Sequence, residues 1–353
     1  MIWLPLLFII SLIAIWAFTK IALTGQDLSK YDLQVEPLFS DKAASPPHFE
    51  LEKQFTDIDP DFERLTKQQQ LHQLRKTMDD AGLRVPTNAV VSTADSAPVE
   101  GEWVIAPGAD PDKRLLYIHG GAFMMGSPQS HRIITSKFSE ISGAAVFAVN
   151  YRKLPENARL DCLEDCQDAY QWLLNNGPDG EKPTDQLYIA GDSAGANMCL
   201  VLLAWIRDSQ LPAPKAAVVL SPATDSTLSS PSIRKNLATD AMLQSFMGQI
   251  MRVPRTILLL TSWLNTRVRP NDPRISPIHD DLSNLPPLLI QASNSECLAD
   301  DARRYTNKAR AEGSDVTLQL WREMMHVWHL FEPELDEAKD AFEQIRLFLL
   351  QHR

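Results

Sequence analysis

A serine between two glycines is the first feature of this chain that could carry out chemistry. Residues 191–195 read GDSAG, with a short apolar run before them and a longer one after them. A serine hydroxyl attacks a carbonyl carbon when a neighbouring base accepts its proton, so Ser193 is a candidate nucleophile for acyl transfer. The pattern Gly-x-Ser-x-Gly is short enough to occur by chance, and a serine in an ordinary tight turn is the competing interpretation.

The histidine that could act as the base follows a late apolar run. Where a nucleophile lies on a strand–turn–helix elbow, the serine, the acid and the histidine follow one another in this order along the chain. His326 comes five residues after Trp321, which ends the last strand-like run, and His329 is its competitor three residues later. We predict His326 as the base and expect His329 to line the pocket or to lie at the surface.

The carboxylate that would orient this histidine should follow the strand-like run at 288–290. Glu296 is the first acidic residue after that run, and Asp300 and Asp301 stand where the next helix should begin. Carboxylates in a first helical turn are often caps or partners of the helix dipole. Glu296 is therefore the better candidate on position alone.

A Gly-Gly pair could supply N–H donors for the negative charge that develops on the carbonyl oxygen. Residues 119–123 read HGGAF and follow the strand-like run at 114–118. Main-chain N–H groups aimed at this oxygen stabilise the transition state. His119 is expected to fix the loop through hydrogen bonds. The predicted donors, all through main-chain N–H groups, are Gly121, Ala122 and Ala194.

Alternating short apolar runs and longer helical stretches would position these residues. Strand-like runs lie at 114–118, 145–149, 187–190, 216–220, 287–290 and 316–321. The alternation predicts an α/β fold with a mainly parallel central sheet and helices on both faces. Ligands in such folds lie outside the C-terminal ends of the strands. A strand before Gly191 and a helix after Ser193 are the setting that a nucleophile elbow needs.

Three further segments lie outside this core pattern. We expect residues 25–98 to form a tether and N-terminal cap helices, and residues 99–353 to form the catalytic domain. Residues 222–285 interrupt the alternation with three Ser-Pro dipeptides and an apolar helical middle, so we interpret them as a cap insertion. Residues 1–24 differ from both.

The segment 1–24 carries an apolar run that suggests a membrane anchor. Ile2 to Phe18 is apolar except for Ser11, and Lys20 follows the run. Seventeen residues is the short end of what spans a bilayer as a helix. A cleaved signal sequence is the alternative, although it would need a basic region before the run. We predict a protein held at the membrane by this single segment, on a side that the sequence leaves open.

Composition limits the class of protein and its partners. The chain has 353 residues, of which 44% are hydrophobic and 22% charged, as is typical of a globular protein with a full core. A net charge of −11 argues against a nucleic-acid partner, because such proteins present a basic face. The four cysteines match no zinc pattern. We predict no metal and no cofactor, and a homodimer stays open as the assembly.

Several separated motifs together resemble the hormone-sensitive-lipase-like (GDXG) family of α/β-hydrolases, which includes many bacterial carboxylesterases. The resemblance runs from about residue 100 to the end of the chain. It rests on HGGAF, GDSAG, NYRKLPE at 150–156, DPRISPIHDDLSNLPPLLIQ and MMHVWHLF. The third glycine of the family's HGGG is Ala122 here. Members commonly carry Asp-Pro-Leu-x-Asp-Glu with the first aspartate as the acid, whereas this chain carries ECLADD at 296–301, so Glu296 replaces that aspartate and Asp300 stays an alternative.

The resemblance implies a serine carboxylesterase that hydrolyses short- to medium-chain acyl esters through an acyl-enzyme on Ser193. A small-molecule ester is then the expected substrate, and the segments 25–98 and 222–285 should shape the pockets. A lipase acting on membrane lipid esters and a binding module without turnover are the alternatives. The candidate apolar liners of the pockets are Met124, Met125 and Trp328, and packing in the core is an equal interpretation of these three residues.

Overall fold

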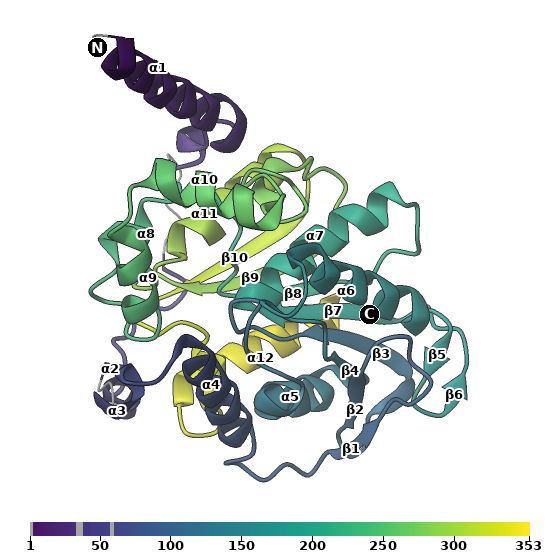
Figure 1. Ribbon diagram of the computed structural model, residues 1–353. Coiled ribbons are helices and arrows are strands. Elements are labelled where there is room, and N and C mark those ends of the chain that lie inside the picture. The colour runs from purple at the N-terminus through teal and green to yellow at the C-terminus, as the bar shows by residue number, and fades with distance from the viewer. Residues whose placement is uncertain (1–2, 33–37, 57–59) are drawn as a thin grey trace.

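An eight-stranded sheet forms the centre of the computed structural model, which describes residues 3–32, 38–56 and 60–353 (Figure 1). The strand order is β1-β2-β4-β3-β7-β8-β9-β10; the pairs β1–β2 and β2–β4 are antiparallel and the others are parallel. The predicted α/β fold with a mainly parallel sheet is therefore confirmed. The strands are β1 (Val90–Thr93), β2 (Gly101–Ile105), β3 (Asp110–Ile118), β4 (Ala144–Val149), β7 (Leu187–Asp192), β8 (Ala217–Leu220), β9 (Leu288–Ser293) and β10 (Val316–Trp321), and a separate small pair is β5 (Asn176–Gly177) with β6 (Gly180–Glu181).

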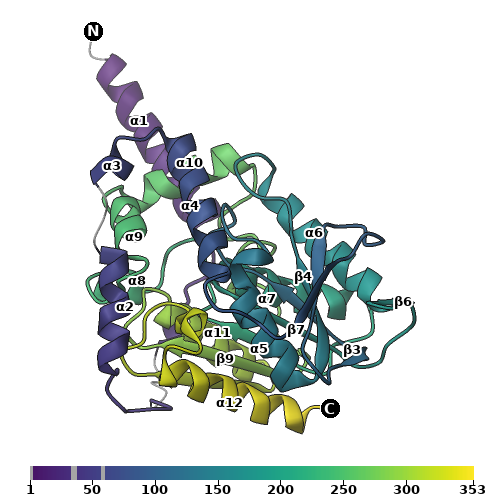
Figure 2. The ribbon, with the colours of Figure 1, turned by 90° about the horizontal axis from the view of Figure 1, so that it is seen from below.

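The central strands are apolar along their whole length because both faces of the sheet are covered. Along β3, Leu116 and Ile118 point into one apolar cluster, while Leu115 and Tyr117 point into the other. The first cluster joins the sheet to α6, α7 and α11, and the second joins it to α5 and α12, which lie side by side in Figure 2. These helices are α5 (Arg132–Ser142), α6 (Arg159–Leu173), α7 (Ser193–Asp208), α11 (Ala299–Ala311) and α12 (Asp336–Gln351).

The register of the sheet brings the ends of four strands to one edge. Ile118 at the end of β3 pairs with Gly191 in β7, and Leu220 at the end of β8 pairs with Asp192 and with Gln291 in β9. The loops that follow β3, β7, β8 and β9 therefore leave the sheet close together, and the loop after β10 joins them through the β9–β10 pair.

Two groups of helices stand outside the sheet and its covering layers. One group precedes β1 and the other lies between β8 and β9, within the predicted insertion. The first group is α2 (Pro46–Thr56), α3 (Pro60–Glu63) and α4 (Lys67–Gly82), and the second is α8 (Ser232–Lys235), α9 (Gln244–Met251) and α10 (Arg255–Thr266). Short helical turns complete the chain at η1 (Thr19–Leu23), η2 (Ser29–Tyr31), η3 (Gln129–His131), η4 (Pro277–His279) and η5 (Trp328–Phe331).

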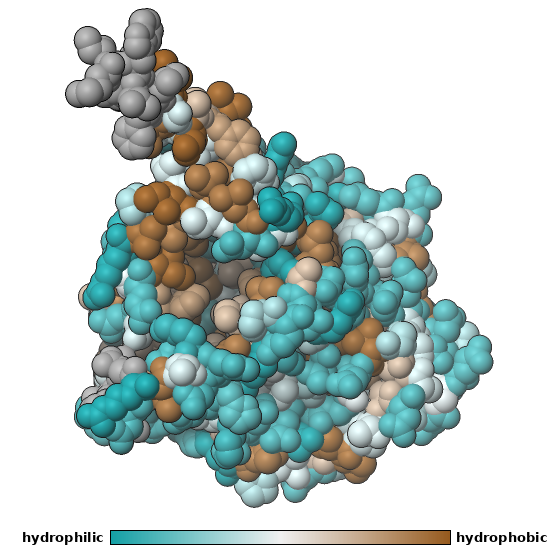
Figure 3. Space-filling model, viewed as in Figure 1, coloured by the Kyte–Doolittle hydropathy of each residue, from teal (hydrophilic) through white to brown (hydrophobic). Residues whose placement is uncertain are grey.

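The N-terminal helix α1 (Trp3–Phe18) projects from the body, and apolar side chains cover much of its visible surface (Figures 1 and 3). Ile10, Ile13 and Trp16 are each more than half exposed. At about 1.5 Å per residue, its 16 residues extend for about 24 Å, which is less than the ~30 Å of a bilayer core. None of the helices in the described residues is both long and apolar enough to cross a bilayer. The predicted anchor in residues 1–24 therefore has no support from the structure, and its first two residues lie outside the described part.

Candidate active site

Ser193 lies on a sharp turn between the end of β7 at Asp192 and the start of α7. Its φ angle is 51°, in the left-handed region that a residue with a Cβ rarely adopts. Gly191 and Gly195 allow this turn to pass directly beside β3, because a Cβ at either position would collide with the carbonyl oxygen of Ile118. The predicted strand–turn–helix setting is present, and it presents the serine hydroxyl at the edge where the loops gather.

His326 and Glu296 meet this serine from the loops after β10 and β9. The Oγ–H of Ser193 donates to Nε2 of His326 over 2.9 Å, and Nδ1–H of His326 donates to Oε2 of Glu296 over 2.7 Å. Glu296 is fully buried and His326 is 3% exposed. Because the carboxylate accepts at Nδ1, it fixes the tautomer in which Nε2 is free to accept a proton.

The other acid considered from the sequence, Asp300, lies away from this chain of hydrogen bonds. Its carboxylate accepts from the main-chain N–H of Ser232 and pairs with the guanidinium of Arg303. Asp300 therefore joins the first turn of α11 to the start of α8 (Ser232–Lys235).

The pKa of His326 is raised above its ordinary value of 6.5. Burial of the imidazole lowers this pKa, but the hydrogen bond and the negative charge of Glu296 outweigh burial. The site thus favours the imidazolium form that appears when the serine proton is transferred.

His329 and Trp328 do not face the site as expected. His329 is fully buried, its Nε2 bonds with Oε1 of Gln291, and burial lowers its pKa to about 3. Trp328 is fully buried in an apolar cluster with Met325 and Phe331. The prediction of a pocket-lining or surface position is wrong for His329, and Trp328 takes the core position that was its other interpretation, since the helical turn η5 directs both rings inward.

The loop after β3 turns three consecutive residues into the left-handed region. Gly121, Ala122 and Phe123 have φ angles of 112°, 53° and 62°. Within the described residues, neither the N–H of Gly121 nor that of Ala122 donates a hydrogen bond to another group of the chain. Two main-chain donors are therefore free on the loop that the sequence analysis singled out, and Ala194 lies in the first turn of α7 beside the serine.

Two buried side chains fix the start of this loop. The N–H of Gly120 and the hydroxyl of Tyr117 both donate to Oδ1 of Asp192, over 3.0 and 2.7 Å. His119 stacks on Tyr151 with ring centroids 4.2 Å apart, and burial together with nearby positive charge lowers its pKa well below the ordinary value. His119 is therefore a neutral structural residue, as expected, whereas Asp192 is a positioning residue that could have been noticed at the variable position of GDSAG.

Arg75 in α4, in the segment before β1, holds the same loop. Its guanidinium donates to the carbonyl oxygens of Met124 and Leu154, over 2.8 and 2.9 Å, and forms a bidentate pair with Glu156. The pair with Arg75 lowers the pKa of Glu156 to about 2. Sequence reasoning missed Arg75, because its partners are main-chain oxygens far away in the sequence.

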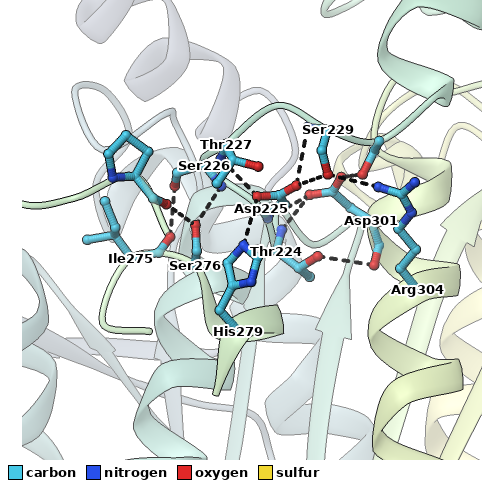
Figure 4. A network of polar contacts seen from close by, with 12 residues as sticks. Thr224, Asp225, Ser226, Thr227, Ser229, Ile275, Ser276, His279, Asp301 and Arg304 are labelled. Atoms are coloured by element: carbon cyan, nitrogen blue, oxygen red, sulfur yellow. Dashed lines mark hydrogen bonds and ion pairs between the residues drawn. The ribbon is translucent and has the colours of Figure 1, made fainter. Parts of the chain in front are cut away.

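A buried polar network ties both ends of the segment between β8 and β9 to α11 (Figure 4). Oδ2 of Asp301 accepts from the N–H groups of Thr224 and Asp225, over 2.6 and 3.0 Å. At the other end of the insertion, Nε2 of His279 lies 3.5 Å from Oδ1 of Asp225. Burial and the charge of Asp225 raise the pKa of Asp301 to about 7. The two ends of this segment are thus bonded together and to α11.

No cluster of histidine, cysteine, aspartate or glutamate within the described ranges could hold a metal ion. The four cysteines are buried free thiols.

Residues 115–330 match the profile of the α/β hydrolase fold family. An acetyl-hydrolase from Streptomyces hygroscopicus is 38% identical over 267 residues, which cover 76% of this chain and 84% of that protein. An esterase from Acinetobacter venetianus is 32% identical, with 78% and 87% covered. A carboxylesterase/phospholipase from Mycobacterium tuberculosis is 33% identical, with 75% and 70% covered.

Solved structures agree with these relatives. The crystal structure of an esterase/lipase from an uncultured bacterium superimposes with a TM-score of 0.75 at 33% identity and covers 88% of this chain and 99% of that one. An esterase from the bacterial hormone-sensitive lipase family superimposes with a TM-score of 0.74 at 30% identity, with the same shares covered. The sequence-based resemblance is therefore confirmed.

Proposed function

Since this chain belongs to the hormone-sensitive-lipase-like family of α/β-hydrolases and is a serine carboxylesterase, we propose that Ser193, His326 and Glu296 are its catalytic triad. The observation that carries the proposal is the unbroken chain of hydrogen bonds from Glu296 through His326 to Ser193, at 2.7 and 2.9 Å. Its three members come from three different loops at one edge of the sheet, as in other enzymes that use a serine nucleophile.

In the first half of the reaction, His326 Nε2 takes the hydroxyl proton while Oγ of Ser193 attacks the ester carbonyl carbon. The bond that forms is the Oγ–C bond, and the carbonyl π electrons move to the oxygen. The imidazolium then gives its proton to the leaving alkoxide as the C–O bond to the alcohol breaks. Glu296 stabilises the imidazolium and stays ionised throughout.

The negative carbonyl oxygen needs donors that are in place before the reaction. We assign this role to the main-chain N–H groups of Gly121, Ala122 and Ala194. The free N–H groups on the left-handed loop support the first two, and the position of Ala194 in the first turn of α7 supports the third. Removing one such donor in a serine hydrolase costs about 2.7–4 kcal/mol of transition-state stabilisation.

In the second half, His326 takes a proton from water, and the hydroxide oxygen attacks the acyl-enzyme carbonyl. The Oγ–C bond breaks, Ser193 regains its proton from His326, and the carboxylic acid leaves.

Short- to medium-chain acyl esters are the proposed substrates. The name of the acetyl-hydrolase relative supports a small acyl group. We propose that residues 25–98 and 222–285 form the cap that shapes the acyl and alcohol pockets, with the half-buried Met124 and Met125 as liners. The name of the carboxylesterase/phospholipase relative makes a lipid ester the second candidate substrate.

A series of p-nitrophenyl esters from acetate to palmitate, run on the purified protein beside Ser193→Ala, tests the proposal. We expect a burst of p-nitrophenol equal to the enzyme, the fastest turnover with short chains, and neither in Ser193→Ala. No burst and no turnover at any chain length would refute the catalytic proposal and leave a binding module. A preference for long-chain lipid esters would instead support the lipase alternative.

A further inference from the structure

The loop between β9 and α11 carries Glu296, and side chains of the cap insertion hold its backbone. Nδ2 of Asn236 donates to the carbonyl oxygens of Asn294 and Glu296, over 2.8 and 2.9 Å. The hydroxyl of Ser232 donates to the carbonyl oxygen of Cys297 over 2.7 Å. Main-chain groups outside helices and strands need such partners when they are buried, and here the insertion supplies them.

Asp240 joins the same loop to a cap helix. Its Oδ2 accepts from the N–H of Cys297 over 2.7 Å, and its Oδ1 accepts from the N–H of Leu243, the residue before α9, over 2.9 Å. The side chain is 1% exposed, so water cannot easily replace either bond. One buried carboxylate therefore links the residue beside Glu296 to the start of α9.

Glu296 needs this support more than a shorter acid would. Glutamate has one more rotatable bond than aspartate, so its carboxylate reaches His326 in one orientation only if the backbone beneath it is fixed. Among the described residues, the Glu296 carboxylate has one hydrogen bond besides the one to His326: its Oε1 accepts from the N–H of Ser293 over 2.8 Å. The bonds from Asn236 and Asp240 to the loop backbone add to this restraint.

We propose that Asn236 and Asp240 are positioning residues of the esterase reaction, which fix the loop so that the carboxylate of Glu296 stays in hydrogen-bond contact with His326. The proposal rests on the triad proposed above. Neither side chain contacts Ser193 or His326 in the structure, and both act through the backbone of the loop.

The charges around His326 give this role a distinctive signature. The acidic groups that face the imidazole are Glu296 from its own loop, Asp240 from the insertion and Asp192 from β7, and all three raise the pKa of His326 against the effect of burial. Removing the charge of Asp240, or loosening Glu296 through Asn236, should therefore lower the pH at which His326 is protonated.

The test compares Asp240→Asn and Asn236→Ala with the matched control Asp225→Asn. Asp225 is also a buried carboxylate of the insertion that accepts main-chain N–H groups, those of Thr227 and Ser229, but it belongs to the network of Figure 4 and does not bind the loop of Glu296. With p-nitrophenyl acetate and active-site titration, we expect kcat to fall about 10- to 100-fold in the two test variants at unchanged KM, as for other small misplacements of catalytic groups. The acidic limb of kcat/KM should move to lower pH in both, whereas Asp225→Asn should lower only the Tm.

The outcomes separate this proposal from the proposed triad. Glu296→Gln is measured in the same series, and if it keeps full activity, the triad itself is wrong. If Glu296→Gln is inactive while Asp240→Asn and Asn236→Ala keep the wild-type limb and kcat, only the positioning role is refuted. If Asp240→Asn does not fold, the kinetics of Asn236→Ala test the positioning role. A second measurement on Asn236→Ala is the low-field proton NMR signal of Nδ1–H of His326. This signal should weaken or shift if Asn236 positions Glu296, and it would stay unchanged if Asn236 were merely structural.

Discussion

Replacing Glu296 by glutamine should inactivate the enzyme without disturbing its fold. Oε1 of Glu296 accepts from the N–H of Ser293, so the glutamine oxygen is held at that position. The amide NH2 then points at Nδ1 of His326, where the carboxylate now accepts over 2.7 Å. A donor at this position requires Nδ1 to be unprotonated, and the imidazole proton moves to Nε2.

With its proton on Nε2, His326 cannot accept the proton of Ser193. The equivalent change of acid to amide in another serine hydrolase lowers kcat about 10⁴-fold, and removal of the acid in a second one costs about 3 × 10⁴. We therefore expect a fall in kcat of about 10³- to 10⁴-fold, or about 4–5.5 kcal/mol of barrier at ~1.4 kcal/mol per tenfold. Turning the amide around would restore the tautomer but would leave the buried N–H of Ser293 facing an NH2 group, which costs about 1–3 kcal/mol.

The assay is the kcat and KM for p-nitrophenyl acetate, with Tm measured on the same preparation. KM should change little, because Glu296 is fully buried and does not reach the substrate. The control is Asp300→Asn, whose carboxylate binds Ser232 and Arg303 rather than His326, and it should keep kcat within a few-fold of the wild type. Loss of activity in Asp300→Asn with full activity in Glu296→Gln would refute the assignment of the acid.

Four further outcomes follow from the same geometry. Because the pKa of His326 is raised above 6.5, its protonated form persists to higher pH than in a free imidazole, and kcat/KM should fall on acidification along a limb centred above pH 6.5. Glu296→Asp withdraws the carboxylate by one methylene from His326 and should cost about 10- to 100-fold in kcat, measured with the same ester. Arg75→Met removes the hydrogen bond to the carbonyl oxygen of Met124, so the loop that carries the free N–H groups is held less firmly. We expect kcat to fall about tenfold. The Tm of Arg75→Met should fall only modestly. Asp301 has a pKa of about 7 in the folded state against 3.8 in the unfolded state, so the folded state binds this proton more tightly. The free energy of unfolding should therefore decrease as pH rises from about 4 to 7. Urea titrations should show this slope in the wild type and a flatter one in Asp301→Asn.

The sequence was sufficient for the fold and for the residues that meet at Ser193. Local patterns carry this information: a short apolar run before Gly191, a helix after it, and chemically distinctive residues at the ends of later strands. Glu296 could be preferred over Asp300 because it follows the end of β9 more closely, whereas Asp300 lies in the first turn of α11. In the structure, Glu296 accepts from Nδ1–H of His326, whereas Asp300 binds Ser232 and Arg303.

The supporting residues could not be predicted in the same way. Arg75 and Asp240 bind main-chain groups 49 and 57 residues away, and every residue has such groups, so no residue-type pattern marks the partner. Their role depends on how a cap segment lies over a loop, which the sequence does not state. The apolar run of α1 shows the opposite difficulty, because a strong local pattern suggested an anchor that a 16-residue helix does not support.

The proposed cap and the proposed triad are therefore not independent parts. Arg75 of α4 holds the loop after β3, and Asp240, just before α9, holds the loop of Glu296, so each cap segment is bonded to one side of the site. The base of the insertion is fixed again by Asp301. A movement of the proposed cap that admits a substrate can leave these bonds intact only if it is confined to the part of the insertion that follows Asp240. Any larger movement must break them. If it breaks them, the loop after β3 and the loop of Glu296 lose these restraints while the site is open, and we expect turnover to require the return of the proposed cap.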